Sequence, residues 1–324
     1  MPDWARFSAQ KGLGLACAAG ATSGIVILSV ISGGGIGMVL AYVTPLPLLL
    51  IGLAFGLGAC LAASAVGALV VAVAGMAAVP AFVVIGAFPA LLLSAAALRR
   101  RVDIDGVARW SETGELLMAM AFGAVLVMGL VCLALPTEGQ SIEVWLKSQA
   151  EPMVESGLPN ATPEVKAAIV GLWIAVMPAM VGAAWFVMTM INGVIAQWAV
   201  SQAGHALRPA PSYGRMRLPR WLAAAAALAG GLSLIGGDGG YLARNMAILL
   251  LLPFLLAGVA DLHGILRRRP YGGLWLGLFY GVFFALFGWA ALPVTLWGLV
   301  TQFGRSRRQD TAQDQEDRNG SDSA

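Results

Sequence analysis

Three pairs of polar side chains stand within apolar stretches of this chain, where they could bind a ligand. The pairs are Asn192 with Gln197, Arg244 with Asn245, and Asp261 with His263. Polar and ionisable groups in apolar surroundings are costly, so they are candidates for function by default. We therefore treat these six residues as candidate ligand-binding residues and consider a structural role for each pair.

Asn192 and Gln197 share one apolar stretch with Trp185 and Trp198. Polar groups among aromatic side chains could line a small-molecule pocket. The same groups could instead make hydrogen bonds between helices, each worth about 1 kcal/mol or less. The sequence leaves both interpretations open.

Arg244 and Asn245 stand near the start of another apolar stretch. Arg244 could bind an anionic ligand in an outward-facing cavity. It could also pair with Asp238, or extend its charged end to lipid headgroups.

Asp261 and His263 are two residues apart, so they do not share a helix face. They could form a proton-coupled or ligand-binding pair. They could also be solvated at the membrane interface, with Asp261 offsetting the charge of Arg267, Arg268 and Arg269.

Signatures of catalysis are missing from the sequence. Cys17, Cys60 and Cys132 lie in apolar segments without metal or redox spacing, and the chain has two histidines. No phosphate-binding loop, nucleophile elbow or metal-ligand cluster occurs. The sequence predicts a protein that is not an enzyme and uses no metal or cofactor.

The elements that position these residues are predicted to be membrane-spanning helices. No charged residue or histidine occurs from Gly12 to Leu98, and Arg99, Arg100 and Arg101 follow. Only 11% of the chain is charged, against about 25% in ordinary globular domains. The basic clusters all flank apolar segments, so we expect a lipid bilayer as partner and no nucleic acid.

Segment lengths and the positive-inside rule give the predicted topology. Pro45 and Pro47 should kink or unwind the second span. Thr162-Pro163-Glu164 is typical of a helix start. The predicted spans are 13–32, 36–56, 58–77, 80–98, a fifth ending near Leu135, a sixth from Pro163 to about Gln202, 221–236 and 241–265.

Two further regions complete the predicted fold. Ile142, Trp145 and Leu146 suggest a short interfacial helix that Pro152 would end. Residues 270–304 are uncharged and are predicted to form a hairpin of two short spans that breaks around 288–293. The fold class is therefore all-α, a polytopic transmembrane helix bundle of about ten spans, with eight or nine as alternatives.

The predicted organisation is one transmembrane domain, 1–304, followed by a disordered cytoplasmic tail, 305–324. Both termini are predicted to lie in the cytoplasm, and the protein in the cell inner membrane.

Small residues recur at four-residue spacing on two predicted helices, Ala16, Gly20 and Gly24 on the first and Gly273, Gly277 and Gly281 near the end. Such faces let helix backbones approach closely. Packing within the chain and docking of a membrane-protein partner or a second copy are both open.

Three stretches together resemble the YybS-like family of uncharacterised bacterial multi-pass membrane proteins. They are Thr44-Pro45-Leu46-Pro47 with Gly52 and Gly56; Arg244-Asn245 with Ala257-Gly258-Val259-Ala260-Asp261-Leu262-His263; and Trp297-Gly298-Leu299-Val300 with Arg305-Ser306-Arg307-Arg308.

That resemblance implies a fold like that of the substrate-binding subunits of energy-coupling-factor transporters. Such subunits bind a small molecule between helices and dock on a partner through small residues of the first helix. By that resemblance, Ala16, Gly20 and Gly24 would be the docking residues. The leading hypothesis is a protein that binds or transports a small molecule, and the alternative is a scaffolding protein of the cell envelope. The oligomeric state is left open.

Overall fold

The chain folds into two compact units of packed helices. A computed structural model describes residues 3–31, 35–102, 106, 108–211 and 216–321. Unit 1 is Met1–Pro211 and unit 2 is Ser212–Ala324, so the boundary falls inside the single domain predicted over 1–304. Because 84% of the structure is helical, the all-α class is confirmed but for one short hairpin.

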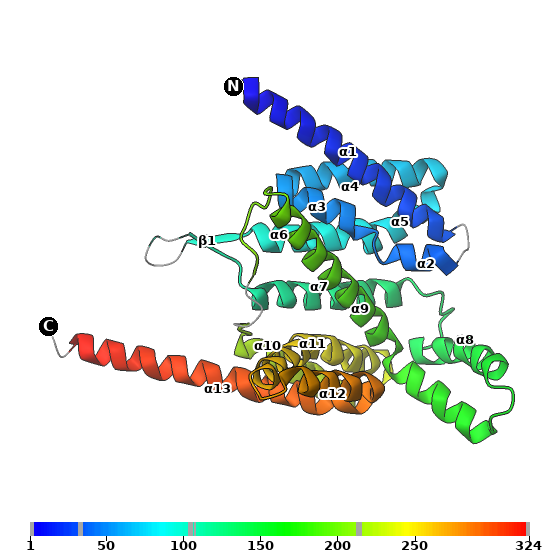
Figure 1. Ribbon diagram of the computed structural model, residues 1–324. Coiled ribbons are helices and arrows are strands. Elements are labelled where there is room, and N and C mark those ends of the chain that lie inside the picture. Colours follow the sequence, from blue (N-terminus) through cyan, green and yellow to red (C-terminus); the bar gives the residue numbers. More distant parts are fainter. Residues whose placement is uncertain (1–2, 32–34, 103–105, 107, 212–215, 322–324) are drawn as a thin grey trace. The chain divides into compact units, whose positions relative to one another are not determined.

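Prolines break the second predicted span of unit 1 (Figure 1). Pro45 begins a new helix after a turn at Tyr42–Thr44, so the predicted span 36–56 consists of two short helices. Gly56, with φ of 94°, then makes the sharp turn into the next helix, a conformation that glycine adopts without strain. The first four helices are α1 (Asp3–Ile31), α2 (Gly35–Ala41), α3 (Pro45–Phe55) and α4 (Leu57–Ala74).

A second break lies in the fourth predicted span. Pro89 has no N–H to bond the carbonyl of Ile85, and the helix widens into one π-helical turn at this point. The segments in order are η1 (Met76–Ala78), α5 (Val79–Phe82), the π-helical η2 (Val83–Ala87) and α6 (Phe88–Leu98).

A two-stranded antiparallel hairpin follows, where the sequence predicted a cytoplasmic loop. Strand β1 (Arg100–Val102) pairs with β2 (Ala108–Trp110), and Arg100 lies opposite Trp110. The Arg100 guanidinium lies 4.2 Å from the centre of the Trp110 ring, a cross-strand cation–π contact. This hairpin is the exception to the all-α prediction among the described residues.

Helix α9 (Pro163–Gln202) completes unit 1 after α7 (Thr113–Leu133) and α8 (Ile142–Gly157). Its predicted start is confirmed, because the Thr162 hydroxyl accepts a hydrogen bond from the Val165 N–H and Pro163 is the first helical residue. The prediction that Pro152 ends α8 is wrong. Pro152 and Ser148 are both exposed, so water can satisfy the Ser148 carbonyl that lost its donor.

Unit 2 is built around α11, which packs against α10 and α13. The chain bends by 119° between α12 and α13, at Leu286 and not at the predicted 288–293. Helix α13 continues through 305–321, where the composition predicted disorder. The segments are α10 (Arg220–Leu232), η4 (Ser233–Ile235), α11 (Gly237–Arg267), α12 (Gly272–Ala285) and α13 (Phe287–Ser321).

The prediction of ten spans is not confirmed. In the described residues, six helices are long and apolar enough to cross a membrane, and the bent α12–α13 pair makes seven if it counts as one span. Two predicted spans are only short apolar helices, Val39–Phe55 and Arg220–Ile235, which fall below the roughly 20 residues that a crossing needs. The six are Gly12–Val30, Leu57–Ala74, Met76–Leu98, Thr113–Leu133, Pro163–Gln202 and Gly237–Arg267.

Candidate functional site

Helix α9 bonds to both broken segments of unit 1. The Trp185 indole N–H donates to the carbonyl of Val84, in the π-helical turn, at 2.8 Å. The Asn192 amide donates to the carbonyl of Tyr42, in the break between α2 and α3, at 2.6 Å. The two donors are seven residues apart, so they lie on one face of α9, two turns from each other.

The helix breaks leave backbone groups that need hydrogen-bond partners. Hydrocarbon offers no hydrogen-bond partner, so irregular backbone at membrane depth must find partners within the protein. Trp185 and Asn192 supply them. The sequence predicted the break at Pro45 and Pro47 and left a hydrogen bond between helices open as a role for Asn192, but it did not identify the acceptors at Tyr42 and Val84.

A cavity of about 320 Å³, which we call the membrane cavity, lies where the two breaks meet α9 and α7. Its volume is at the lower end of the range of small-molecule sites. The Trp185 ring stacks on Phe88 with centroids 5.5 Å apart, which fixes this wall of the cavity. Residues that line it include Tyr42, Val84, Ile85, Val127, Trp185 and Met188.

Two buried side-chain oxygens lie near the break between α2 and α3, one on Thr44 within the break and one on Asn192 of α9. Within the described part of the chain, Thr44 Oγ1 and Asn192 Oδ1 have no hydrogen-bond partner. A buried polar atom left without a partner costs roughly 1–3 kcal/mol. The region around Tyr42 therefore keeps unused hydrogen-bonding capacity beside an apolar cavity.

Gln197, the partner of Asn192 in the sequence prediction, has a different environment. Its amide donates to the Ser201 hydroxyl at 3.1 Å and to the Arg208 carbonyl at 3.2 Å. The buried guanidinium of Arg208 donates to the carbonyls of Ala97, at the end of α6, and Ser111. Gln197 thus stabilises a chain connection, and it is not among the residues that line the membrane cavity.

Arg208 was not predicted to have a role. It is 5% exposed and donates to carbonyls of α6 and of the segment before α7. A positive charge at a helix C-terminus is also favoured by the helix dipole. A buried arginine cannot be distinguished from an exposed one by residue type and spacing alone.

Arg244 and Asn245 lie two turns into α11, in unit 2. The Asn245 amide is fully buried and donates to the carbonyl of Tyr241, one turn earlier in the same helix. The Arg244 guanidinium lies 5.2 Å from the centre of the Tyr241 ring. Both side chains thus interact with Tyr241 of their own helix, Asn245 with its carbonyl and Arg244 with its ring.

Asp261 and His263 link α11 to two different helices. The Thr301 hydroxyl on α13 donates to Asp261 Oδ2 at 2.7 Å. His263 Nδ1 lies 3.1 Å from the Tyr280 hydroxyl on α12. Arg244 is 17 residues from Asp261 along α11, about 25 Å, so the two polar pairs do not form one site.

The long apolar helices of this chain indicate a membrane protein. A family model described as "Predicted membrane protein (DUF2232)" matches residues 21–300. The chain belongs to the DUF2232 family. The comparisons found no match among curated proteins or solved structures.

In this DUF2232 protein the small residues of α1 face α4. Ala16 is buried, and a side chain at Gly20 would collide with the backbone carbonyl of Ala63. A Cβ at Gly24 would lie 2.9 Å from the carbonyl of Gly67. This face, predicted for packing or for a partner, is thus occupied by a helix of the same chain.

The second small-residue face of the DUF2232 protein has a different environment. A Cβ at Gly273, Gly277 or Gly281 on α12 would meet no described atom within 4 Å. Also among the described residues, no group of three or more His, Cys, Asp or Glu side chains could hold a metal ion.

Proposed function

We propose that this DUF2232 protein binds a small, mostly apolar molecule in the membrane cavity, as a multi-pass protein of the inner membrane. The observation that carries the proposal is the meeting of two broken helices with the continuous helices α7 and α9 around a cavity of about 320 Å³. Broken helices at membrane depth commonly form the binding sites of transporters. The walls select for hydrocarbon, because Val84, Ile85 and Val127 offer only apolar side chains.

Transport is part of the same proposal and draws support from the resemblance to transporter substrate-binding subunits. A membrane-protein partner, such as an ATPase complex, would then couple binding to movement. Because α4 covers Ala16, Gly20 and Gly24, that partner would need a surface other than this face of α1. The positive charges at Arg99–Arg101 and Arg267–Arg269 support cytoplasmic termini. The proposed role involves no catalysis.

A cavity-filling variant tests this function. Ala184 lines the membrane cavity, so Ala184→Trp should fill it. Val187 is exposed on the same helix and is not among the lining residues, so Val187→Trp is the matched control. The experiment measures the thermal midpoint of the detergent-purified protein across a library of apolar compounds, with native mass spectrometry for molecules that co-purify.

A ligand present at 100 times its Kd should stabilise the wild-type protein and Val187→Trp by about 2.7 kcal/mol, and Ala184→Trp far less. Equal stabilisation of all three proteins would place the ligand elsewhere. Absence of any stabilising ligand, together with co-purification of wall-synthesis or cell-division proteins, would favour the scaffolding alternative.

A further inference from the structure

An apolar cavity lies in unit 2, where α12 meets α11 and α13. Its volume is about 320 Å³, and we call it the unit 2 cavity. The residues that line it are all hydrophobic, and Pro293 and Val294 form the α13 side. Trp275, Leu278 and Val282 form the α12 side and are each about half exposed, so the cavity is open to its surroundings. Such a site accepts hydrocarbon and offers nothing to a polar group.

The unit 2 cavity reaches the turn that joins α11 to α12. Its α12 residues, from Trp275 to Val282, cover two helical turns, about 11 Å. On α11, Leu266 lines the cavity and directly precedes Arg267. A Cβ at Gly272 would lie 2.6 Å from the carbonyl oxygen of Arg267, so α12 begins against the end of α11. One end of the cavity is therefore next to the charged end of α11.

Three arginines follow Leu266 at this end. Arg267, Arg268 and Arg269 are all exposed, and within the described part of the chain none of their side chains forms an ion pair. Tyr271, in the turn, is 84% exposed, and amphipathic aromatic side chains are enriched at the level of lipid headgroups. The cavity thus joins an apolar space to three positive charges at the membrane interface.

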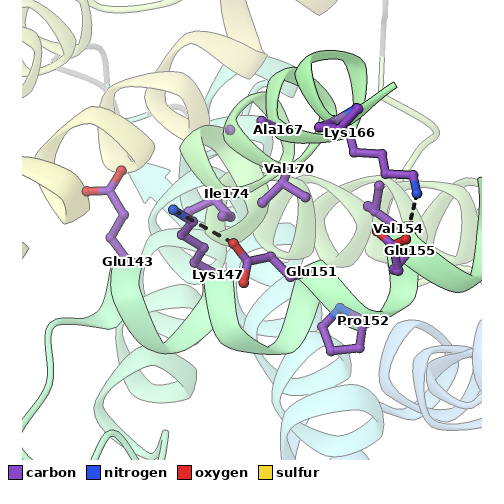
Figure 2. A pocket seen from close by; sticks show the side chains of 12 residues that line it. Glu143, Lys147, Glu151, Pro152, Val154, Glu155, Lys166, Ala167, Val170 and Ile174 are labelled. Carbon is purple, nitrogen blue, oxygen red and sulfur yellow. Dashed lines mark hydrogen bonds and ion pairs between the residues drawn. The ribbon is translucent and has the colours of Figure 1, made fainter. Parts of the chain in front are cut away.

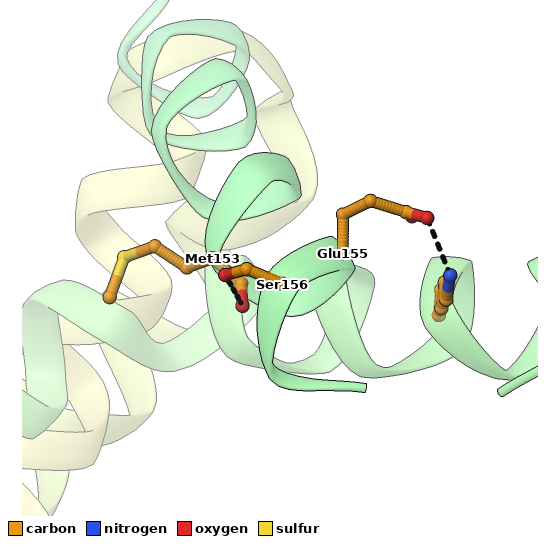
Figure 3. Close-up of polar contacts among 4 residues, drawn as sticks. Met153, Glu155 and Ser156 are labelled. Carbon is orange, nitrogen blue, oxygen red and sulfur yellow. Dashed lines mark hydrogen bonds and ion pairs between the residues drawn. The ribbon is translucent and has the colours of Figure 1, made fainter. Parts of the chain in front are cut away.

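Lysines in unit 1 differ from these arginines because carboxylates lie beside them. Lys147 and Glu151 line a cavity of about 790 Å³ between α8 and α9, with Nζ 3.8 Å from Oε1 (Figure 2). Lys166 Nζ lies 2.6 Å from Oε1 of Glu155 (Figure 3). Each lysine charge is offset within the chain, whereas the three arginines of unit 2 can attract an external anion.

We propose that unit 2 binds an anionic phospholipid, with one acyl chain in the unit 2 cavity and the phosphate against Arg267–Arg269. The apolar lining requires a hydrocarbon occupant, and the adjacent charges select a negative headgroup. Basic clusters that directly follow a membrane helix recognise anionic lipids in this way. The site lies in a different unit from the membrane cavity and does not depend on the ligand proposed there.

Phosphatidylglycerol is the probe, and phosphatidylcholine with the same acyl chains is its zwitterionic counterpart. Native mass spectrometry of the full chain in a maltoside detergent measures the Kd of the first bound lipid. We expect phosphatidylglycerol to bind at least fivefold more tightly. The preference should shrink as the salt concentration rises, because the arginines are exposed. Equal affinity for the two lipids would overturn the proposal.

Charge-neutral variants locate the headgroup. The triple variant Arg267→Gln, Arg268→Gln, Arg269→Gln should bring the affinity for phosphatidylglycerol close to that for phosphatidylcholine. The same three changes at Arg99–Arg101 are the matched control, because that triplet already has Glu115 as a partner. The control should bind within twofold of the wild-type protein. A preference that survives in the first variant contradicts the assignment.

A steric variant locates the acyl chain. Leu278 lines the cavity, so Leu278→Trp should occupy part of it and weaken phosphatidylglycerol binding severalfold. Leu296, on α13, is not among the lining residues, and Leu296→Trp should bind normally. Both leucines are more than half exposed, so both variants should keep the wild-type thermal midpoint. A folded Leu278→Trp variant with unchanged affinity would exclude the cavity as the site.

Glycerol phosphate separates a lipid from a soluble anion. It carries the phosphate without acyl chains, so a large excess should leave the bound phosphatidylglycerol in place. Displacement of the lipid by glycerol phosphate would show that the arginines bind a soluble phosphate and that the cavity contributes nothing, which would refute the lipid site.

Discussion

The glycine faces of α1 and α12 have the same four-residue spacing and different surroundings. On α1, Gly20 and Gly24 lie so close to α4 that an added side chain would contact its backbone carbonyls. On α12, Gly273, Gly277 and Gly281 have open space before them in the described structure. The spacing predicts which residues share a helix face, but not whether another helix covers that face.

Unit 2 has its own close helix contact, and it lacks this spacing. Gly258 on α11 lies against the backbone of Val294 on α13, and Gly298 on α13 lies against the backbone of Phe254. One glycine from each helix is enough to bring α11 and α13 together. Single glycines of this kind carry no periodic signal in a sequence.

The largest effect should come from filling the covered face of α1. Gly20→Leu would force α1 and α4 apart and should cost about 3 kcal/mol or more, because the obstacle is backbone that cannot move aside. Reversible unfolding in a mixed detergent measures this. Gly14→Leu on the same helix is the control, since a Cβ there meets nothing. Equal destabilisation by both variants would mean that the collision with α4 is not the cause of the loss.

Removing a side-chain hydrogen bond should lower the stability by less than forcing a new side chain against a backbone. Trp185→Phe keeps an aromatic ring on α9 but leaves the Val84 carbonyl without its indole donor, and should cost about 1 kcal/mol. Trp173→Phe, at a half-exposed position of the same helix, should be nearly neutral. Unfolding midpoints in the same detergent series test both. A neutral Trp185→Phe would mean that the π-helical turn needs no support from α9.

Removing the polar contact between α11 and α13 in unit 2 should lower the stability by less still. Thr301→Val removes the hydroxyl that donates to Asp261 and should cost about 0.6 kcal/mol, the average for such bonds between membrane helices. Thr295→Val is the matched control, because the Thr295 hydroxyl bonds only within α13, to Ala291. A loss well above 1 kcal/mol for Thr301→Val alone would give Asp261 a larger role in holding α11 to α13.

The smallest effect is expected on the open face of α12. Gly277→Leu should change stability by no more than about 0.5 kcal/mol, because the added side chain meets no described atom. Unfolding and light scattering together measure stability and oligomeric state. A large loss, or dissociation of an oligomer, would show that a second copy or a partner covers this face.

The sequence predicted what depends on local chemistry. The start of α9 at Thr162 and Pro163 and the break at Pro45 follow from hydrogen bonds that neighbouring residues make or lose. Both were correct for the reasons given.

Contacts between distant residues could not be predicted in this way. Trp185 and Val84 are 101 residues apart, and Asn192 and Tyr42 are 150 apart. The count of ten spans is not confirmed, for a related reason. It divided apolar length by the thickness of a bilayer, whereas the segments around Pro45 and after Arg220 form helices too short to cross one.

The length of α9 has a mechanical consequence. Its 40 residues extend about 60 Å, twice the thickness of the hydrocarbon layer. Near its start, Pro163, Lys166 and Ile174 line a cavity between α9 and α8, and further along Val181 and Trp185 line the membrane cavity. A rotation of this helix about its axis would therefore move one wall of each cavity at once.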